Sequence, residues 1–276
     1  MFNALNLRTE KRKKYEMDLG IQGRVAFVSA SSQGLGFACA LSLAREGVSV
    51  TLNGRNTEKL EAAAADIRRR VEGAAVGFIA ADLTSEEGRA RILMTLPAVD
   101  ILINNNAGPP PGKLDDWDEA ALLKAIGANM VPAVQLMRAY IPGMRVRGFG
   151  RIVNITSAMV KSPHYEMGLS TSARTALTAI SKAISVEVAA DNVTINNLLP
   201  ERIDTPRQEF MAQRMMKERN ISREEARRRI ADTIAARRLG RPEEFGDACA
   251  YLCSVQAGYI SGQNLQLDGG SYEGLI

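Results

Sequence analysis

Short apolar runs alternate with longer amphipathic segments along most of this chain. The runs have the length and the Val, Ile and Leu content of buried strands, and they lie at residues 24–30, 48–52, 75–80, 100–103, 151–156, 193–198 and 264–267. Segments with apolar residues at helical spacing separate them, at residues 36–46, 57–71, 85–96, 117–142, 170–190 and 242–256. This alternation predicts a parallel sheet covered by helices on both faces.

Right-handed crossovers between such strands give an α/β fold, a doubly wound parallel sheet of Rossmann-like type. We find no internal repeat, low-complexity stretch or Pro/Gly/Ser-rich linker in the sequence. The pattern therefore predicts a single domain at residues 21–276, preceded by an arm at residues 1–20.

One segment, at about residues 204–238, departs from the alternation. From residue 207 onward it holds ten basic residues against five acidic ones, with methionines at roughly helical spacing. Two interpretations stay open. The segment is either a charged, solvated helix pair, or a mobile flap over a negatively charged substrate, with methionines as adaptable contacts.

Composition excludes several classes of protein. The 276 residues are 46% hydrophobic and 24% charged, which is typical of a folded chain. A net charge of +4 without an aromatic-interleaved basic stripe argues against nucleic-acid binding. We find no signal-length apolar run and no apolar span of 18 residues, so we expect no membrane segment. Cys39, Cys249 and Cys253 form no paired framework, which favours the cytoplasm, and a single histidine argues against a metal site.

The first predicted strand leads into a glycine-bearing turn and then a helix. Glycines in such a turn let backbone N–H groups approach a pyrophosphate, whose charge the helix N-terminus favours. The candidate cofactor-binding residues are Ser29, Ser31, Ser32, Gln33, Gly34, Leu35 and Gly36.

The residues after the second strand bear on the choice of cofactor. An NAD site usually has Asp or Glu about 20 residues beyond the glycines, on the ribose 2′-hydroxyl. This chain has Asn53-Gly54-Arg55-Asn56 there, with no acid and one arginine. A guanidinium suits a 2′-phosphate, so Arg55 favours NADP(H) over NAD(H), unless it is a solvated loop residue.

The turn resembles the TGxxxGxG motif of the short-chain dehydrogenase/reductase family, with Ser29 at the Thr position and Ala30 at the first Gly. Further segments follow that family's order over residues 21–271, most closely its 3-oxoacyl-carrier-protein reductase-like branch. They are Asp82-Leu83, the NNAG-like stretch at residues 104–108, Asn129, residues 152–157 ending in Ser157, Ile203-Asp204-Thr205, Gly240-Arg241-Pro242 and Asp268-Gly269-Gly270.

The resemblance implies several roles. Asp82 and Leu83 would border the adenine, Thr205, next to Ile203, would bind the carboxamide, and Asn129 and Ser157 would be catalytic. In the NNAG-like stretch the literal string makes Asn105 and Asn106 the two asparagines, whereas an ungapped count from Asp100 makes them Asn104 and Asn105. We favour the ungapped count, which places Asn105 in the cofactor site. Family members also imply a homodimer or homotetramer built on the helices at residues 117–142 and 170–190.

The catalytic motif departs from the family. A member has Tyr about 13 residues after the serine and Lys four further on, and this chain has Ser170 and Arg174 there. Tyr165 is the nearest tyrosine, but Leu169 stands four beyond it. A serine hydroxyl is a far weaker acid than a tyrosine, whereas Arg174 can hold the ribose hydroxyls as the lysine does.

Other groups could supply the missing proton. Lys161, His164, Tyr165 and Glu166 lie between Ser157 and Ser170, and Glu201 stands where relatives have glycine. His164 has the most suitable ordinary pKa and Tyr165 is the same chemical type as the missing acid, so both are candidate catalytic residues. The sequence does not choose among them.

Two functions are consistent with these features. The first is an NADP(H)-dependent oxidoreductase, transferring hydride between the nicotinamide and a small carbonyl or alcohol substrate. An acidic or acyl-thioester substrate would suit the basic segment. The alternative is an NADP(H)-binding pseudoenzyme with a sensor or assembly role, which the missing tyrosine and lysine favour.

Overall fold

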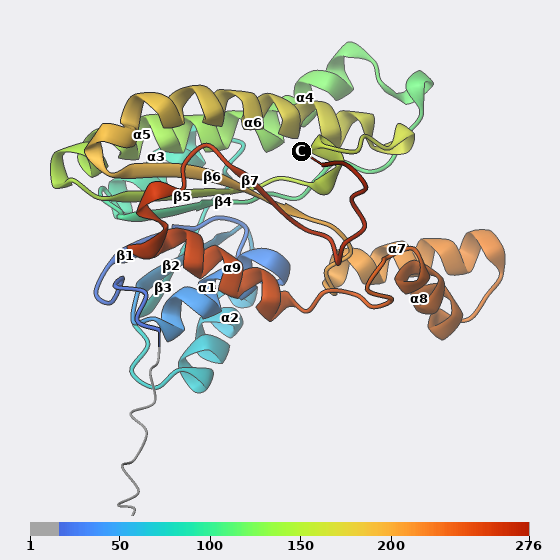
Figure 1. Cartoon of the computed structure of the whole chain (residues 1–276), viewed down its shortest axis with the longest axis horizontal. Coiled ribbons are helices and arrows are strands. Elements are labelled where there is room, and N and C mark those ends of the chain that lie inside the picture. Colours follow the sequence, from blue (N-terminus) through green and yellow to red (C-terminus); the bar gives the residue numbers. More distant parts are fainter. Residues whose placement is uncertain (1–16, 276) are drawn as a thin grey trace, which may run out of the picture.

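The computed structural model describes residues 17–275 (Figure 1). Within them, one parallel sheet has the strand order β3-β2-β1-β4-β5-β6-β7, which confirms the predicted doubly wound architecture. The sequence reverses direction in the sheet between β1 and β4, the place where such folds bind ligands at the carboxyl ends of the strands. The strands are β1 (Val25–Val28), β2 (Ser49–Gly54), β3 (Val76–Ala80), β4 (Ile101–Asn104), β5 (Gly150–Ile155), β6 (Val193–Pro200) and β7 (Asn264–Leu267).

Helices cover both faces of this sheet (Figure 1). On one side lie α1 (Gly34–Arg45), α2 (Thr57–Arg70) and α9 (Pro242–Cys253), and on the other α3 (Glu86–Thr95), α4 (Glu119–Asn129), α5 (Val131–Arg147) and α6 (Gly168–Val188). Strand residues alternate between the two layers, so Ile101 and Ile103 pack in one core cluster and Leu102 in the other. Short 3₁₀ turns lie at Leu114–Asp116, Ala158–Val160, Tyr165–Met167, Ala189–Asp191 and Gln256–Tyr259.

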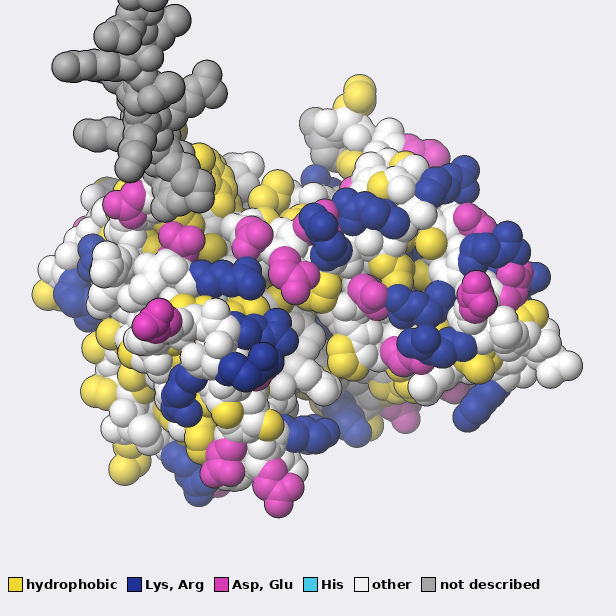
Figure 2. Space-filling view, turned by 90° about the horizontal axis from the view of Figure 1, so that it is seen from below, with side chains coloured by type: hydrophobic (Ala, Val, Ile, Leu, Met, Phe, Trp, Pro, Cys, Tyr) yellow, Lys and Arg dark blue, Asp and Glu magenta, His cyan; other side chains and the backbone are white. Residues whose placement is uncertain are grey.

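The basic segment folds as a helix pair, α7 (Pro206–Arg219) and α8 (Arg223–Asp232). The pair projects beyond the carboxyl ends of the strands (Figure 1) and holds together around the buried Ala212, Ala226 and Ile230. Figure 2 shows basic and acidic side chains interleaved over this projection. We call residues 204–238 the flap from here on.

The helix predicted at residues 117–142 is two helices. It breaks at Met130, because Pro132 in the first turn of the next helix has no N–H to continue the ladder. The second helix runs past the predicted end to Arg147 and stops at Gly148, whose left-handed conformation (φ 63°) closes it.

By length and mean hydropathy (1.3), the run Glu119–Arg147 is apolar enough to span a membrane, so the sequence-based statement that no such run exists is wrong. In the structure, however, α5 packs against the sheet and buries Leu136, Met137 and Tyr140 there. These contacts are those of a core helix in an α/β domain.

The start of the domain also differs from the prediction. Residues 1–16 of the predicted arm lie outside the described residues. Leu19 is buried in the core, and its carbonyl accepts a hydrogen bond from the Val255 amide (3.0 Å). Packing of the domain therefore begins before residue 21, because the apolar side chain of Leu19 belongs to the same core cluster as residues of α9.

A row of four buried or half-buried asparagines crosses the sheet, one on each of β4, β5, β6 and β7. The strand register aligns Asn104, Asn154, Asn197 and Asn264. Each side-chain amide donates to the next oxygen, at 2.8, 3.1 and 2.8 Å, and Asn154 also donates to Ser181 on α6 (2.9 Å). Buried amides need such partners, so the row favours this strand register and holds Asn104 at the end of β4.

Candidate active site

Two buried serines shape the turn that follows β1. The Ser29 hydroxyl donates to the Ile103 carbonyl (2.9 Å) and accepts from the Asn105 amide (2.8 Å). The Ser31 hydroxyl donates to the Val28 carbonyl (2.6 Å) and accepts from the Asn53 amide (3.0 Å). Both were predicted to bind cofactor, but their hydroxyls are used within the fold, tying β1 to β4 and to β2. Their part is to position the turn.

The turn packs tightly against the start of α1. A Cβ on Gly36 would lie 2.5 Å from the Ala30 carbonyl oxygen, so only glycine allows this approach. Ala30 itself has φ 46°, the left-handed conformation that the family's glycine adopts without strain. The backbone shape typical of a phosphate-binding turn is thus kept at a residue with a side chain.

Two helix N-termini meet at this turn. A Cβ on Gly34, in the first turn of α1, would lie 4.0 Å from side-chain atoms of both Thr205 and Pro206 at the start of α7. Neither N-cap residue, Gln33 of α1 or Thr205 of α7, accepts a side-chain capping bond. The positive dipole ends of both helices and the first backbone N–H groups of α1 are therefore available to an anion, and α7 adds the Arg207 N–H. Pro206 has no N–H, and the Gln208 and Glu209 N–H groups donate to the Thr205 carbonyl. A dinucleotide pyrophosphate fits this donor set.

The end of β2 provides the second part of a dinucleotide site. Arg55 is exposed there, and a Cβ on the neighbouring Gly54 would lie 3.7 Å from the Ser32 hydroxyl. Asp82 accepts hydrogen bonds from the amide and hydroxyl of Thr84, which, with a smaller contribution from the Arg55 charge, lower the pKa of its carboxyl. Arg55 and Ser32 can thus serve a phosphate on the ribose, beside Asp82 and Leu83.

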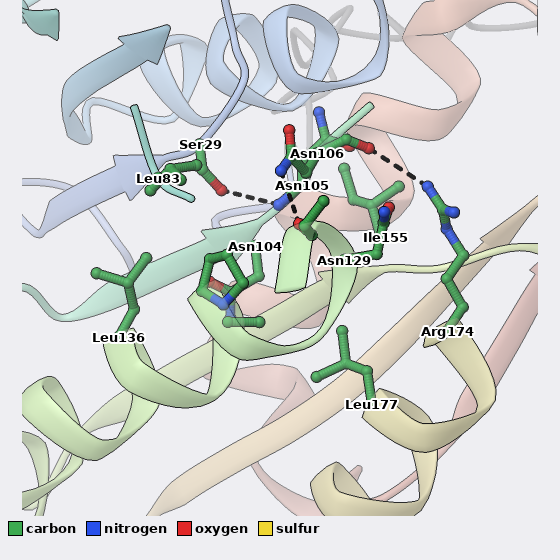
Figure 3. Close-up of a pocket in the computed structure, with 13 residues that line it drawn as sticks. Ser29, Leu83, Asn104, Asn105, Asn106, Asn129, Leu136, Ile155, Arg174 and Leu177 are labelled. Atoms are coloured by element: carbon green, nitrogen blue, oxygen red, sulfur yellow. Dashed lines mark hydrogen bonds between the residues drawn. The ribbon is translucent and has the colours of Figure 1, made fainter. Parts of the chain in front are cut away.

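A pocket of about 340 Å³, open solvent included, lies at the carboxyl ends of β1, β4 and β5 (Figure 3). Five of the predicted site residues line it: Ser29, Leu83, Asn105, Asn129 and Arg174. Asn104 and Asn106, the alternatives for the second asparagine of the NNAG-like stretch, line it too. The sequence did not single out the remaining lining residues as part of the site: Ala128, Pro132, Ala133, Leu136, Ile155 and Leu177.

Arg174 and Ser170 lie one turn apart on α6, and they contact each other. The Arg174 Nη1 donates to the Ser170 Oγ (2.6 Å), and its Nη2 donates to the Asn106 carbonyl (3.3 Å; Figure 3). Both side chains are buried. Among residues 17–275 no carboxylate lies within 4 Å of this guanidinium, and burial, together with the charge of Arg207, lowers the pKa of Arg174 to about 10.

Gly108 makes room for this pair. A Cβ there would lie 3.1 Å from the Arg174 Nη1 and 3.5 Å from the Ser170 Oγ. A larger residue would push against the guanidinium head, so the small residue after β4 allows the arginine its position.

The resemblance implies catalytic roles for Ser157 and Asn129, and of the two only Asn129 lines the pocket. Ser157 is half-buried just after β5, and its hydroxyl accepts from the Met159 amide (3.2 Å). Asn129 is buried at the end of α4, with its side-chain amide donating to the Ala125 carbonyl (3.3 Å). The buried Ile203 pairs with Gly240 beside the start of α7.

The other candidate proton donors are not brought into the pocket. His164 and Tyr165 are exposed, and Tyr165 lies beside Trp117 with ring centroids 6.0 Å apart. Glu166 pairs with Arg214 (3.5 Å) and Glu201 with Arg202 (3.9 Å). Lys161 lies over the ring of Tyr272 (5.2 Å). Lys161, His164, Tyr165 and Glu166 lie on or beside the short 3₁₀ turns between β5 and α6, and Glu201 follows β6.

The asparagine stretch after β4 contributes two residues that brace the site. β4 ends at Asn104, and the side chain of Asn105, which both counts make a family asparagine, donates to the Ala30 carbonyl of the turn (3.1 Å). The Asn106 side chain donates to the Ala128 carbonyl (2.7 Å), and the Asn106 carbonyl accepts a hydrogen bond from Arg174. Asn106 is one of the two asparagines in the literal count, whereas the ungapped count places it where the family has alanine.

Comparisons with known proteins identify the family of this chain. A sequence-family model described as enoyl-(acyl carrier protein) reductase matches residues 29–272. The chain is 33% identical to the NADPH-dependent reductase BacG of Bacillus subtilis, over 91% of this chain and 99% of that protein. It is 32% identical to dehydrogenase/reductase SDR family member 4 of Bos taurus, over 91% and 88% of the two chains. The solved structure of L-sorbose reductase from Gluconobacter frateurii with NADPH and L-sorbose is similar at a TM-score of 0.88 and 29% identity, covering 94% of this chain and all of that one.

Proposed function

Because the chain belongs to the short-chain dehydrogenase/reductase family, we propose that it is an NADP(H)-dependent oxidoreductase acting on a small carbonyl or alcohol substrate. One observation carries this proposal beyond family membership. Ser170 and Arg174, which the spacing of the sequence assigns to the positions of the family's tyrosine and lysine, are buried in contact with each other, and the arginine lines the pocket next to the predicted dinucleotide-binding turn. A cation and a hydroxyl are thus available where the reacting oxygen needs them.

The cofactor is assigned to residues of the turn and the strand ends. The N-termini of α1 and α7 would hold the pyrophosphate, Arg55 and Ser32 the 2′-phosphate, and Thr205 the carboxamide. NADPH appears in the names of the B. subtilis and G. frateurii proteins, and Arg55 supports the same choice here. When bound, the cofactor supplies or accepts the hydride.

The protein's own residues handle the proton. Ser157 orients the substrate oxygen. Ser170 already accepts a bond from Arg174, so its own O–H is free to donate to that oxygen. As negative charge develops there, the proton passes from Ser170 to the oxygen, Arg174 returns one to Ser170, and solvent reprotonates Arg174. Until it gives up this proton, the positive charge of Arg174 stabilises the developing alkoxide.

Turnover tests this proposal. We expect the purified protein to oxidise NADPH in the presence of at least one member of a panel of ketones, quinones and 3-oxoacyl thioesters, followed by the loss of NADPH absorbance. NADPH binding by calorimetry provides the second readout. Tight binding without turnover over the whole panel would overturn the proposal and favour the NADP(H)-binding pseudoenzyme with a sensor or assembly role.

Replacing Arg55 by alanine tests the cofactor assignment. We expect the Kd for NADPH to rise about 10-fold to 100-fold, because a charge-assisted contact to the 2′-phosphate is lost. The Kd for NADH, which has no such phosphate, should change less than twofold. Arg45→Ala, at the far end of α1, serves as the control. An equal effect on both cofactors would contradict the role of Arg55.

The proposal extends to the assembly and its compartment. We propose a homodimer or homotetramer that uses α4, α5 and α6, whose outer surface carries the exposed Leu123, Val146 and Val186. Cys39, Cys249 and Cys253 are free and buried, which supports the reducing cytoplasm as its compartment. Sedimentation of the full chain at micromolar concentration measures the assembly directly.

A further inference from the structure

Most basic side chains of the flap are neutralised by acidic partners. Arg223 makes two bonds of 2.7 Å to Glu209, and Arg227 pairs with Asp204 at 2.7 Å. The same holds for Arg214 with Glu218 and Glu166, for Arg228 and Arg229 with Glu225, and for Arg238 with Glu244. The acidic partners lie within the flap, or at Glu166 and Glu244 outside it. The positive charge available to a ligand is therefore smaller than the number of arginines in the flap suggests.

Arg207, like Lys217, Arg219 and Arg237, has no acidic partner among the described residues, and it is the one of these four that lies in the first turn of α7. Within residues 17–275 it has no carboxylate within 4 Å, and the contact recorded for its guanidinium is with the ring of Phe210 at 5.5 Å. It lies in the first turn of α7, next to Thr205 and Pro206, which face the dinucleotide-binding turn. An unpaired arginine thus stands beside the site described above.

The orientation of α7 directs Arg207 toward that site. Arg214 lies seven residues on, two turns along the same helix face, and it reaches Glu166 in the segment that leads into α6. The face of α7 that carries both arginines is therefore turned to the segment before Ser170 and Arg174. Arg207 lies close enough to Arg174 for the two positive charges to repel each other, and neither has an acidic partner among the described residues.

We infer that the substrate is a carbonyl compound that carries a carboxylate or a phosphate, and that Arg207 binds this anionic group and determines specificity. The inference rests on the proposed function and adds the substrate class to it. The positive charges of Arg207 and Arg174 act on each other, and a bound anion offsets their repulsion. A planar guanidinium also binds either group through two parallel bonds. The pyrophosphate of the cofactor is the other anion within this region, so the test separates the two.

Matched pairs of acidic and neutral compounds provide the test. Acetoacetate is compared with methyl acetoacetate for the carboxylate, and dihydroxyacetone phosphate with dihydroxyacetone for the phosphate. kcat/KM is measured for the wild type, Arg207→Gln and Arg228→Gln. Arg228 is the control, a flap arginine whose acidic partner Glu225 is still paired with Arg229 after the substitution. Calorimetric binding of the same four compounds to the NADPH-saturated protein, and of NADPH alone, supplies readouts that do not need turnover.

We expect one acidic compound to be preferred over its neutral partner by about 10-fold or more, since charge-assisted bonds are the stronger ones. Arg207→Gln should remove that preference, and Arg228→Gln should keep it. The pair that shows the preference identifies the anionic group. Binding that depends on Arg207 but no turnover would support the inference while refuting the proposed reductase activity. Equal affinity for acid and neutral partner in both pairs, or a loss of NADPH affinity alone in Arg207→Gln, would overturn it.

Discussion

Replacing Arg174 by alanine is expected to lower kcat/KM by about 10³-fold, within the range typical of losing an acid–base group. The change removes the donor to Ser170, the charge near the reacting oxygen and the contact to the Asn106 carbonyl together. NADPH affinity should fall as well if this arginine holds the ribose. Ser170→Ala should reduce kcat by about 10²-fold to 10³-fold and leave the Kd for NADPH unchanged, because it removes the proton path alone.

Steady-state kinetics and calorimetry on the same preparations measure these effects. Arg138→Ala, an exposed position on α5, is the control for loss of an arginine without loss of the site. If Arg174→Ala and Ser170→Ala both keep kcat/KM within threefold of the wild type, another group donates the proton. Unchanged NADPH affinity in Arg174→Ala would show that this arginine does not bind the ribose of the cofactor.

The pH profile adds a signature that a merely structural arginine would not produce. Burial and the charge of Arg207 lower the pKa of Arg174 to about 10, so the side chain is protonated below that pH and neutral above it. Because the reaction uses the protonated form, kcat should be level near neutrality and fall as pH rises through about 10. An arginine with its ordinary pKa would show no such decline in this range.

Replacing Arg151 by methionine should lower the free energy of unfolding by about 3–4 kcal/mol. Arg151 is only 1% exposed, at the start of β5, and its guanidinium donates to the carbonyls of Gly150, Asn192 and Ser254 and to the Asn192 side chain, at 2.9–3.2 Å. It also lies over the ring of Phe149 at 4.3 Å. Methionine fills similar space but leaves these buried oxygens without donors. This costs far more free energy than the loss of an exposed ion pair.

Urea unfolding followed by circular dichroism measures this loss. Arg145→Met is the matched control, since Arg145 is partly exposed and its pairs with Glu187 and Asp191 lie at the surface, where such pairs contribute less than about 1 kcal/mol. NADPH affinity should be unchanged, because Arg151 lies at the end of the sheet opposite the site. Equal losses in the two variants would show that the buried network adds no stability.

Local pattern was sufficient for the strands and most of the helices. The predicted strand at residues 24–30 is centred on Val25–Val28, and the last strand has the predicted bounds. Helix ends were less certain, because Pro132 can either kink a helix or begin a new one, and the choice depends on packing against the sheet. The serines of the turn show the same limit. Spacing identified Ser29 and Ser31, but their hydrogen bonds to neighbouring strands decided what their hydroxyls do.

Sequence alone specifies the doubly wound fold, and it predicts the dinucleotide turn and the replacement of the family's tyrosine and lysine by Ser170 and Arg174. These features follow from the periodicity of apolar residues and from the spacing of motif residues, both of which can be read along the chain. Only the tertiary structure decides which charges remain unpaired. Glu166 neutralises Arg214 across 48 residues of sequence, and Asp204 neutralises Arg227 across 23, while Arg207 has no such partner among the described residues. Ion pairing depends on distances of a few ångströms between segments that the fold brings together, and sequence separation does not reveal them.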